Sequence, residues 1–178
     1  LPNIPSSDTP EGLDEASNKE IKIFGNKPIF SFKPLSHDII GSKLNMMDFD
    51  KASEMSGARF VILKDKLALL ERALSFFMLS LHTQKHNYTE ISPPSLVRDK
   101  ALYGTGQLPK FSKDLFKTNS DHWLIPTAEV PLTNIVANEI IPSKDLPIRY
   151  TALTSCYRSE AGSAGLDTKG MIRLHEFK

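Results

Sequence analysis

Charged and aromatic side chains near the C-terminal end of the sequence have the types and the spacing of a nucleotide-binding site. Arg158 and Glu160 are two residues apart, and Arg173, His175 and Phe177 are spaced in the same way. Because residues two apart on a strand point to the same face, each set shares one face of an extended segment. Guanidinium groups bind phosphate oxygens bidentately, a carboxylate accepts from an exocyclic amine, and a ring stacks on a base. Together they would form a nucleotide site without a phosphate-binding loop.

Two common nucleotide-binding motifs are absent. The sequence contains no G-x-x-x-x-G-K-[ST], and residues 104–106 (Gly-Thr-Gly) are followed by Pro109 where the dinucleotide fingerprint requires glycine. The pattern alone leaves one alternative open, because charges on an exposed hairpin more often form a solvated surface.

The elements that must position these groups are two extended segments, 148–158 and 170–177. The stretch between them, 160–169, contains two glycines and mostly small or polar residues. Two strands around such a loop predict an antiparallel hairpin. Helices and a largely antiparallel sheet give an α+β fold. The other predicted elements are a helix at 49–56 ended by Gly57, strands at 88–92 and 122–125, a helix at 131–140, and edge strands at 21–24 and 29–32.

The strongest periodic signal is an apolar stripe whose members are spaced four and three residues apart. They are Leu63, Leu67, Leu70, Leu74, Phe77 and Leu81. This spacing predicts a helix over 63–81. Phe76 and Met78 widen the stripe in its second half, so that end of the helix needs cover on two sides. Periodicity leaves both core packing within one chain and contact with a partner subunit open.

Composition describes an ordinary globular protein. The 178 residues fit one domain, and 22 basic against 21 acidic side chains give a net charge of +1, so a nucleic-acid partner has to be argued from motifs. One cysteine, Cys156, excludes an internal disulfide and favours a reducing, cytoplasmic setting. The most apolar stretch, 73–81, is about half of a membrane span, so we expect no membrane partner. Because the sequence lacks an initiator Met and ends within a strand-like pattern, we expect a fragment.

Several other side chains have ordinary structural interpretations. His82 and His86 have a helical metal-pair spacing but no accompanying motif, so no metal site is predicted. We expect His175 to be a strand histidine with its hydrogen bonds satisfied, and not a catalytic base. Cys156 is expected to be a small buried residue and Trp123 a core residue.

The residues named first lie in segments that resemble seryl-tRNA synthetases, which are class II aminoacyl-tRNA synthetases. Residues 156–165, 167–170 and 172–177 resemble motif 2 of that family, and the helix at 63–82 with residues 88–94 resembles motif 1, its dimer-forming motif. The segments 103–111 and 125–134 are equally typical, and residues 1–5 resemble the exit from the family's N-terminal coiled-coil arm.

The resemblance implies a domain organisation and a function. Residues 1–57 would connect a coiled-coil arm to residues 58–178, the first part of a class II catalytic domain, whose antiparallel sheet is flanked by helices. The implied activity is a serine–tRNA ligase, which activates L-serine with ATP and Mg²⁺ and transfers it to tRNA(Ser). It also implies a homodimer formed through the Leu63–Pro94 region, in the cytoplasm.

The resemblance also implies roles for single residues. Arg158 would be catalytic, holding the ATP α-phosphate and the serine carboxyl end, while Glu160 binds the adenine amine and Phe177 stacks on the adenine. The implied ATP-binding residues are Arg158, Ser159, Glu160, Arg173, Leu174 and Phe177, and the implied serine-binding residues are Thr127, Ala128, Glu129 and Arg158.

Three features depart from the family pattern. The coiled-coil arm, the acidic residue that completes the serine site after motif 2, and motif 3 are all absent from this sequence. Leu166 and Lys169 stand where relatives often carry basic residues and arginine, respectively. We therefore expect the chain alone to be an incomplete enzyme. An alternative is a synthetase-like module kept for dimerisation or for aminoacylating a carrier protein.

Overall fold

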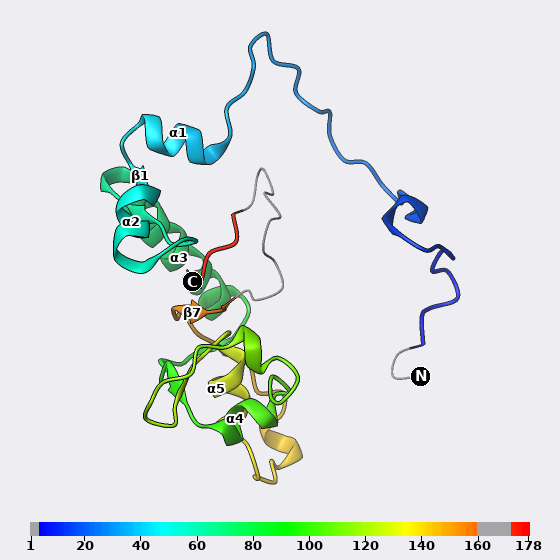
Figure 1. Ribbon diagram of the computed structural model, residues 1–178. Coiled ribbons are helices and arrows are strands. Elements are labelled where there is room, and N and C mark those ends of the chain that lie inside the picture. The colour runs from blue at the N-terminus through cyan, green and yellow to red at the C-terminus, as the bar shows by residue number, and fades with distance from the viewer. Residues whose placement is uncertain (1–3, 160–171) are drawn as a thin grey trace. The chain divides into compact units, whose positions relative to one another are not determined.

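The computed structural model describes residues 4–159 and 172–178, and its backbone contacts divide the chain into two units, Leu1–Pro34 and Leu35–Lys178 (Figure 1). The first unit contains one 3₁₀ turn, η1 (Glu15–Ser17), which begins where the Asp14 carboxylate accepts from the Ala16 N–H. The sequence-based boundary at residue 57, which concerns the connecting segment and the catalytic domain, stays a prediction.

The edge strands predicted at 21–24 and 29–32 are wrong. No strand forms among the described residues of the first unit, and Ile21 and Ile29 are more than nine-tenths exposed. Alternation alone does not make a strand, because its N–H and C=O groups need a neighbouring strand and its apolar face needs cover. Neither is present among residues 4–34.

The second unit opens with four short elements: α1 (His37–Lys43), β1 (Met47–Asp48), α2 (Phe49–Ser56) and β2 (Ile62–Leu63). Strands β1 and β2 pair antiparallel. The helix predicted at 49–56 is confirmed. The Asp48 carboxylate caps it by accepting from the Lys51 N–H at 3.0 Å, and Gly57, with a φ of 86°, ends it.

Helix α3 (Asp65–Lys85) confirms the helix predicted from the apolar stripe, although the first member of the stripe, Leu63, lies in β2 instead. Only Ser75 of this helix is buried. Leu70, Leu74 and Phe77 are each about half exposed or more, so the described part of the chain does not cover the stripe. No helix in that part is both long and apolar enough to cross a bilayer.

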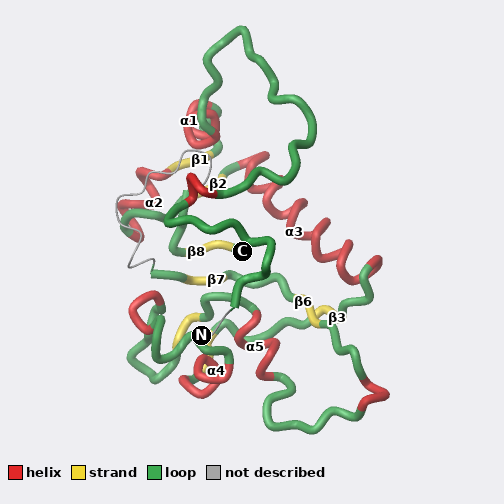
Figure 2. Tube along the Cα trace, turned by 90° about the vertical axis from the view of Figure 1, so that its right-hand side faces the viewer, coloured by secondary structure: helices red, strands yellow, loops and turns green. Residues whose placement is uncertain are grey.

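Among the described residues, the strands after α3 are β3 (Thr89–Glu90), β4 (Leu96–Val97), β5 (Trp123–Leu124), β6 (Tyr150–Thr151), β7 (Cys156–Tyr157) and β8 (Glu176–Phe177) (Figure 2). The pairs β4–β5 and β7–β8 are antiparallel, and β3–β6 is parallel. The segment predicted as one strand at 148–158 is two, because β6 pairs with β3 whereas β7 pairs with β8. The antiparallel hairpin is confirmed at its ends, and its loop lies outside the described residues. Short, mainly antiparallel strand pairs and helices give the predicted α+β fold.

The core lies between β4, β5 and two helices that pack together, α4 (Asp99–Gly104) and α5 (Glu129–Asn134) (Figure 1). Its buried members are Val97, Leu102, Leu108, Leu115, Trp123, Ile125 and Val130. Trp123 is therefore a core residue, as predicted, and its indole N–H donates to the Asp99 carboxylate. Two further 3₁₀ turns are η2 (Ser112–Asp114) and η3 (Ser143–Asp145).

Helix α5 is shorter than the helix predicted at 131–140. It begins two residues earlier and keeps Pro131 in its first turn, where no N–H is required. After Asn134 the chain continues as turns with bonds between residues three apart, such as Glu139 N to Val136 O. Ile140, predicted on the apolar face, is 99% exposed.

Candidate active site

The hairpin brings Arg158 and Phe177 together. Cys156 pairs with Phe177, so Arg158, two residues further on, is the diagonal neighbour of this ring on the same face. The guanidinium carbon lies 5.0 Å from the ring centroid, which is a cation–π contact. Arg158 is exposed and Phe177 is half-buried. The structure thus confirms that a guanidinium and an aromatic ring share one face of the hairpin, as the spacing predicts. We call this face, with Arg158 and Phe177, the hairpin floor or candidate nucleotide floor.

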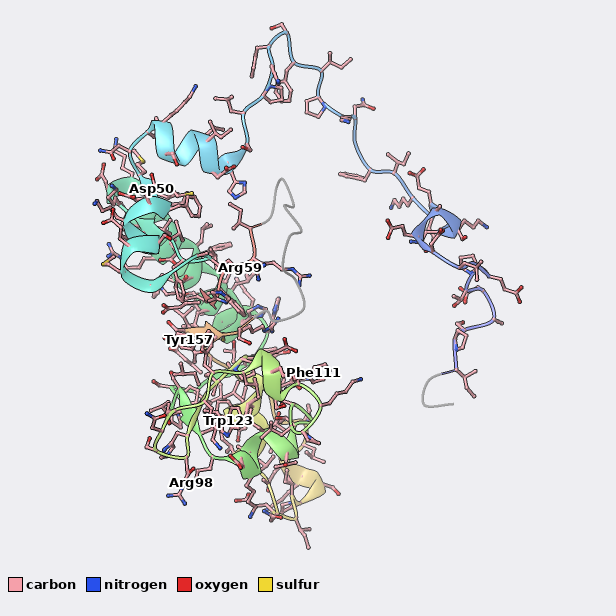
Figure 3. All side chains as sticks on the ribbon, viewed as in Figure 1. Asp50, Arg59, Arg98, Phe111, Trp123 and Tyr157 are labelled. Carbon is pink, nitrogen blue, oxygen red and sulfur yellow. The ribbon has the colours of Figure 1, made fainter. Side chains whose placement is uncertain are left out.

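Strand β7 is also bonded to the segment that follows β5. The Tyr157 N–H donates to the Ile125 carbonyl at 2.8 Å, and Arg158 Nε donates to the Pro126 carbonyl at 3.2 Å. Figure 3 shows Tyr157 between Arg59 and the core residue Trp123. The hairpin floor therefore continues directly into the stretch that begins at Thr127.

Thr127, Ala128 and Glu129 lie at the start of α5. The Thr127 hydroxyl accepts from the Glu129 N–H at 3.3 Å, which fixes the turn into the helix. Ala128 and Glu129 line a cavity of about 590 Å³, together with apolar side chains of α5 and of the segment leading into β6. Thr127 and Arg158 are not part of that lining. The Glu129 side chain is exposed and so available to a cationic group.

The remaining ATP-binding candidates lie on both sides of the hairpin loop. The Ser159 N–H donates to the Asp114 carbonyl at 2.9 Å, and its hydroxyl donates to the Lys113 carbonyl. Arg173 is exposed and Leu174 half-buried, just before β8. Glu160 lies outside the described residues, so its predicted place beside Arg158 stays a prediction.

His175 was predicted to be a strand histidine with its hydrogen bonds satisfied, but it lies at a bend just before β8 and not within a strand. Its ring lies 5.4 Å from that of Phe60 and 5.9 Å from that of Phe116, and its Nδ1 donates to the Arg158 carbonyl at 2.8 Å. Cys156 is buried next to Thr154, whose hydroxyl is 3.4 Å from the sulfur. Both residues therefore make structural contacts within or beside the β7–β8 pair.

Two histidines of α3 lie close together. His82 and His86 have their Nδ1 atoms 3.3 Å apart. Residues 4–159 and 172–178 contain no group of three or more His, Cys, Asp or Glu placed to hold a metal ion.

The pKa of Tyr157 is raised, first because the phenol is partly removed from water and also because the Glu176 carboxylate is next to it. The hydroxyl donates to Glu176 Oε1 at 3.2 Å. Tyr157 therefore stays neutral near pH 7 and braces β7 against β8.

The sequence did not reveal the backbone groups that hold the site together. The carbonyls of Lys113, Asp114 and Pro126 bind Ser159 and Arg158 across 32 to 46 positions of sequence. Backbone carbonyls are present at every residue, so no residue type marks these contacts in advance.

Comparison with known proteins supports the resemblance seen in the sequence. The family model described as "tRNA synthetase class II core domain (G, H, P, S and T)" matches residues 111–178. Proteins named serine–tRNA ligase from Paramagnetospirillum magneticum and Brucella canis are each 60% identical to this chain over 177 residues. The match covers 99% of this chain, which spans 42% of the length of these curated relatives.

Two solved structures have the same fold. The seryl-tRNA synthetase of Pyrococcus horikoshii, complexed with ATP, aligns with a TM-score of 0.86 at 34% identity and covers 98% of this chain and 44% of its own. The cytoplasmic serine–tRNA ligase of Naegleria fowleri, in complex with AMP, aligns with a TM-score of 0.83 at 26% identity and covers 97% and 42%, respectively.

Proposed function

We propose that this chain belongs to the seryl-tRNA synthetase family and is the part of a serine–tRNA ligase that binds ATP and L-serine. The complete protein activates serine to seryl-adenylate and transfers the seryl group to tRNA(Ser). The observation that carries this proposal is the hydrogen bond from Arg158 to Pro126, because it joins the candidate nucleotide floor to the candidate serine segment.

Arg158 is suited to the phosphoryl-transfer step. One of its five N–H donors is used on Pro126, and the planar fork formed by the two terminal nitrogens suits two oxygens of a phosphate. The serine carboxylate attacks the α-phosphorus of ATP in line, the bond to the β-phosphate oxygen breaks, and pyrophosphate leaves. The guanidinium stabilises the negative charge that develops on the α-phosphoryl oxygens. No protein base is required, because the carboxylate is ionised at pH 7.

The adenine stacks on the Phe177 ring. The Arg158 guanidinium contacts the same ring and binds the α-phosphate of the nucleotide. Ser159, Arg173 and Leu174 line the nucleotide site, and Glu160 accepts from the adenine amine. An aromatic platform contributes roughly 1–3 kcal/mol per stacked base. The seryl-tRNA synthetase of Pyrococcus horikoshii, which has the same fold, was solved in complex with ATP and supports this assignment of the nucleotide.

Thr127, Ala128 and Glu129 bind the amino acid. The exposed Glu129 carboxylate pairs with the α-ammonium group of serine, and Thr127 adds a hydroxyl at the same helix start. Polar groups arranged for the serine hydroxyl reject alanine, since alanine leaves them unpaired.

Mg²⁺ is expected with ATP as its counter-ion. The described residues contain no cluster of three or more metal-binding side chains, so the phosphate oxygens of ATP and water would supply most of the ligands of the ion.

The exposed stripe on α3 supports a homodimer through the Leu63–Pro94 region. A helix face with this many exposed apolar side chains is expected to pack against another surface. The interfaces of obligate homodimers resemble a domain core cut in half and would supply that surface. The single cysteine, which cannot form an internal disulfide, supports a cytoplasmic location.

Pyrophosphate exchange by the full-length protein that carries this segment tests the proposal. We expect ATP–pyrophosphate exchange that depends on serine and not on alanine or threonine, followed by charging of tRNA(Ser). Exchange with another amino acid but not with serine contradicts the assignment. Exchange with serine but no charging of tRNA(Ser) indicates a carrier-directed or non-catalytic module instead.

A further inference from the structure

We propose that His175 is a positioning residue for Arg158. This inference rests on the proposed function, because it gives Arg158 a phosphate to bind. The backbone in question is that of Arg158, the residue that directly follows β7 and whose guanidinium must be held in place.

The β7–β8 ladder is irregular at this point. The registered pairs are Cys156 with Phe177 and Tyr157 with Glu176, so Arg158 and His175 are the next residues in the same register, just beyond both strands. In a regular antiparallel ladder, the two residues of a hydrogen-bonded pair exchange both N–H···O bonds. The Arg158 N–H does donate to the His175 carbonyl, at 3.0 Å, but the His175 N–H donates to the Arg59 carbonyl instead, at 2.9 Å.

The imidazole supplies the missing bond. Its Nδ1 is 2.8 Å from the Arg158 carbonyl oxygen, and since a carbonyl only accepts, Nδ1 carries the proton. His175 therefore satisfies both backbone polar groups of Arg158, one with its own carbonyl and one with its ring. The chain before β8 can turn toward Arg59 without leaving the Arg158 carbonyl unpaired.

The ring has little freedom to do anything else. Phe60 and Phe116 contact it from two directions, with ring centroids 5.4 and 5.9 Å away, and so orient Nδ1 toward Arg158. At its other end, Arg158 is held through Nε by Pro126. The guanidinium is thus fixed from its backbone and from its side chain, which is the support that a charge-stabilising group requires.

A role as general base does not fit this geometry. Nδ1 is committed to a backbone carbonyl, and adenylate formation starts from a carboxylate that is already ionised. We therefore expect the hydrogen-bond donor at the Nδ1 position to be the property of His175 that matters.

Three variants of the full-length protein separate these roles. In His175→Asn the amide nitrogen is bonded to Cγ, as Nδ1 is in histidine, so an N–H donor is kept at that position. His175→Gln moves the donor one atom further out, and His175→Phe keeps a ring without a donor. ATP binding by equilibrium dialysis, steady-state exchange with KM for ATP and for serine, and melting temperature are measured for each.

We expect His175→Asn to stay within about threefold of the unmodified protein. His175→Phe and His175→Gln should weaken ATP binding and lower kcat/KM for ATP by about tenfold, the order expected when a hydrogen-bonded carbonyl is left unpaired. The KM for serine should change less than the KM for ATP, since most of the proposed serine contacts come from residues 127–129 and not from Arg158. A purely structural role would affect both substrates together and would not be rescued by asparagine.

The outcomes that overturn the inference are specific. An unmodified level of ATP binding and exchange in folded His175→Phe shows that the bond is not needed. Should that variant fail to fold, equal losses in the Asn and Gln variants overturn it, and a loss in Gln alone supports it. If the unmodified protein neither binds ATP nor exchanges pyrophosphate, the proposed function fails and the positioning role fails with it.

Discussion

Arg158 Nε donates to the carbonyl oxygen of Pro126 at 3.2 Å, across 32 positions of sequence. The same guanidinium lies 5.0 Å from the Phe177 ring, so a single side chain contacts both the returning strand of the hairpin and the residue before Thr127. Adenylate formation needs ATP and serine at one place, and this side chain lies where the two candidate sites meet.

Replacing Arg158 tests its proposed role in charge stabilisation. Arg158→Ala in the full-length protein should reduce kcat/KM for exchange by roughly 10²-fold or more, as the loss of a transition-state donor does elsewhere. Arg158→Lys should also be strongly impaired, because lysine has neither the Nε donor for Pro126 nor a planar fork. Steady-state exchange measures both. An unchanged rate in the alanine variant would place Arg158 on an ordinary surface.

Glu129→Gln tests the serine segment separately from the nucleotide floor. Loss of the carboxylate should raise KM for serine by about tenfold, because one charge-assisted hydrogen bond is removed. KM for ATP should stay the same. Glu139→Gln, at another exposed glutamate in the turns after α5, is the matched control and should change neither constant. Equal changes in the two variants would remove Glu129 from the serine site.

Charged substitutions on α3 test the homodimer. Phe76 and Met78 are 71% and 54% exposed, so Phe76→Glu and Met78→Glu should leave the fold of one chain intact while weakening association. We expect sedimentation equilibrium of the full-length protein to shift toward monomer. Arg72→Glu, an exposed charge on the same helix, is the control. Folded variants that stay fully dimeric would place the interface elsewhere.

Leu102 tests the core beneath the site. Its side chain is fully buried, so Leu102→Ala should lower the free energy of unfolding by about 2–5 kcal/mol, from lost burial and the cavity left behind. Ile140→Ala, at a residue that is 99% exposed, should change it by less than about 0.5 kcal/mol. Urea denaturation of the full-length protein measures both, and similar values for the pair would contradict the described core.

The Asp48–Lys64 pair predicts a pH dependence of stability. The bond from the Lys64 ammonium, at 2.8 Å, and the bond from the Lys51 N–H hold the pKa of Asp48 below its usual range. A folded-state pKa below the unfolded one stabilises the fold above about pH 4, and this stabilisation is lost as the pH falls through the folded value. The melting temperature of the unmodified protein should therefore exceed that of Asp48→Asn at pH 7, and the difference should shrink toward pH 3. A constant difference across this range would rule out the linkage, and Asp50→Asn controls for the loss of a carboxylate from the same turn.

Local patterns predicted the elements of this fold that are stabilised locally. The helix at 49–56 has a capping aspartate and a terminating glycine, and the apolar period of α3 continues from Leu67 to Leu81, about four turns, so both were found from the sequence. The segments at 21–24 and 29–32 alternate equally well but have no partner strand within their unit, and pairing is not a property of the segment itself.

The candidate site was predictable where it depends on the alternation of side chains between the two faces of a strand. The spacing of residues 156 to 177 placed Arg158 and Phe177 on one face, which the pairing of β7 with β8 confirms. The exchange of partners at His175 was not predictable, because it depends on where the backbone of Arg59 happens to pass. Contacts that use main-chain groups from distant segments leave no mark in residue type or period.

The pairing of β7 with β8 also has a consequence for biosynthesis. The core residues, from Val97 to Val130, are all translated before Phe177, so the core can condense on a nascent chain whose nucleotide floor is still unpaired. During that interval Arg158 already has Pro126 but lacks both His175 and Phe177. The face that carries Arg158 and Phe177 therefore cannot form until residue 177 has been translated, which is after the last of these core residues.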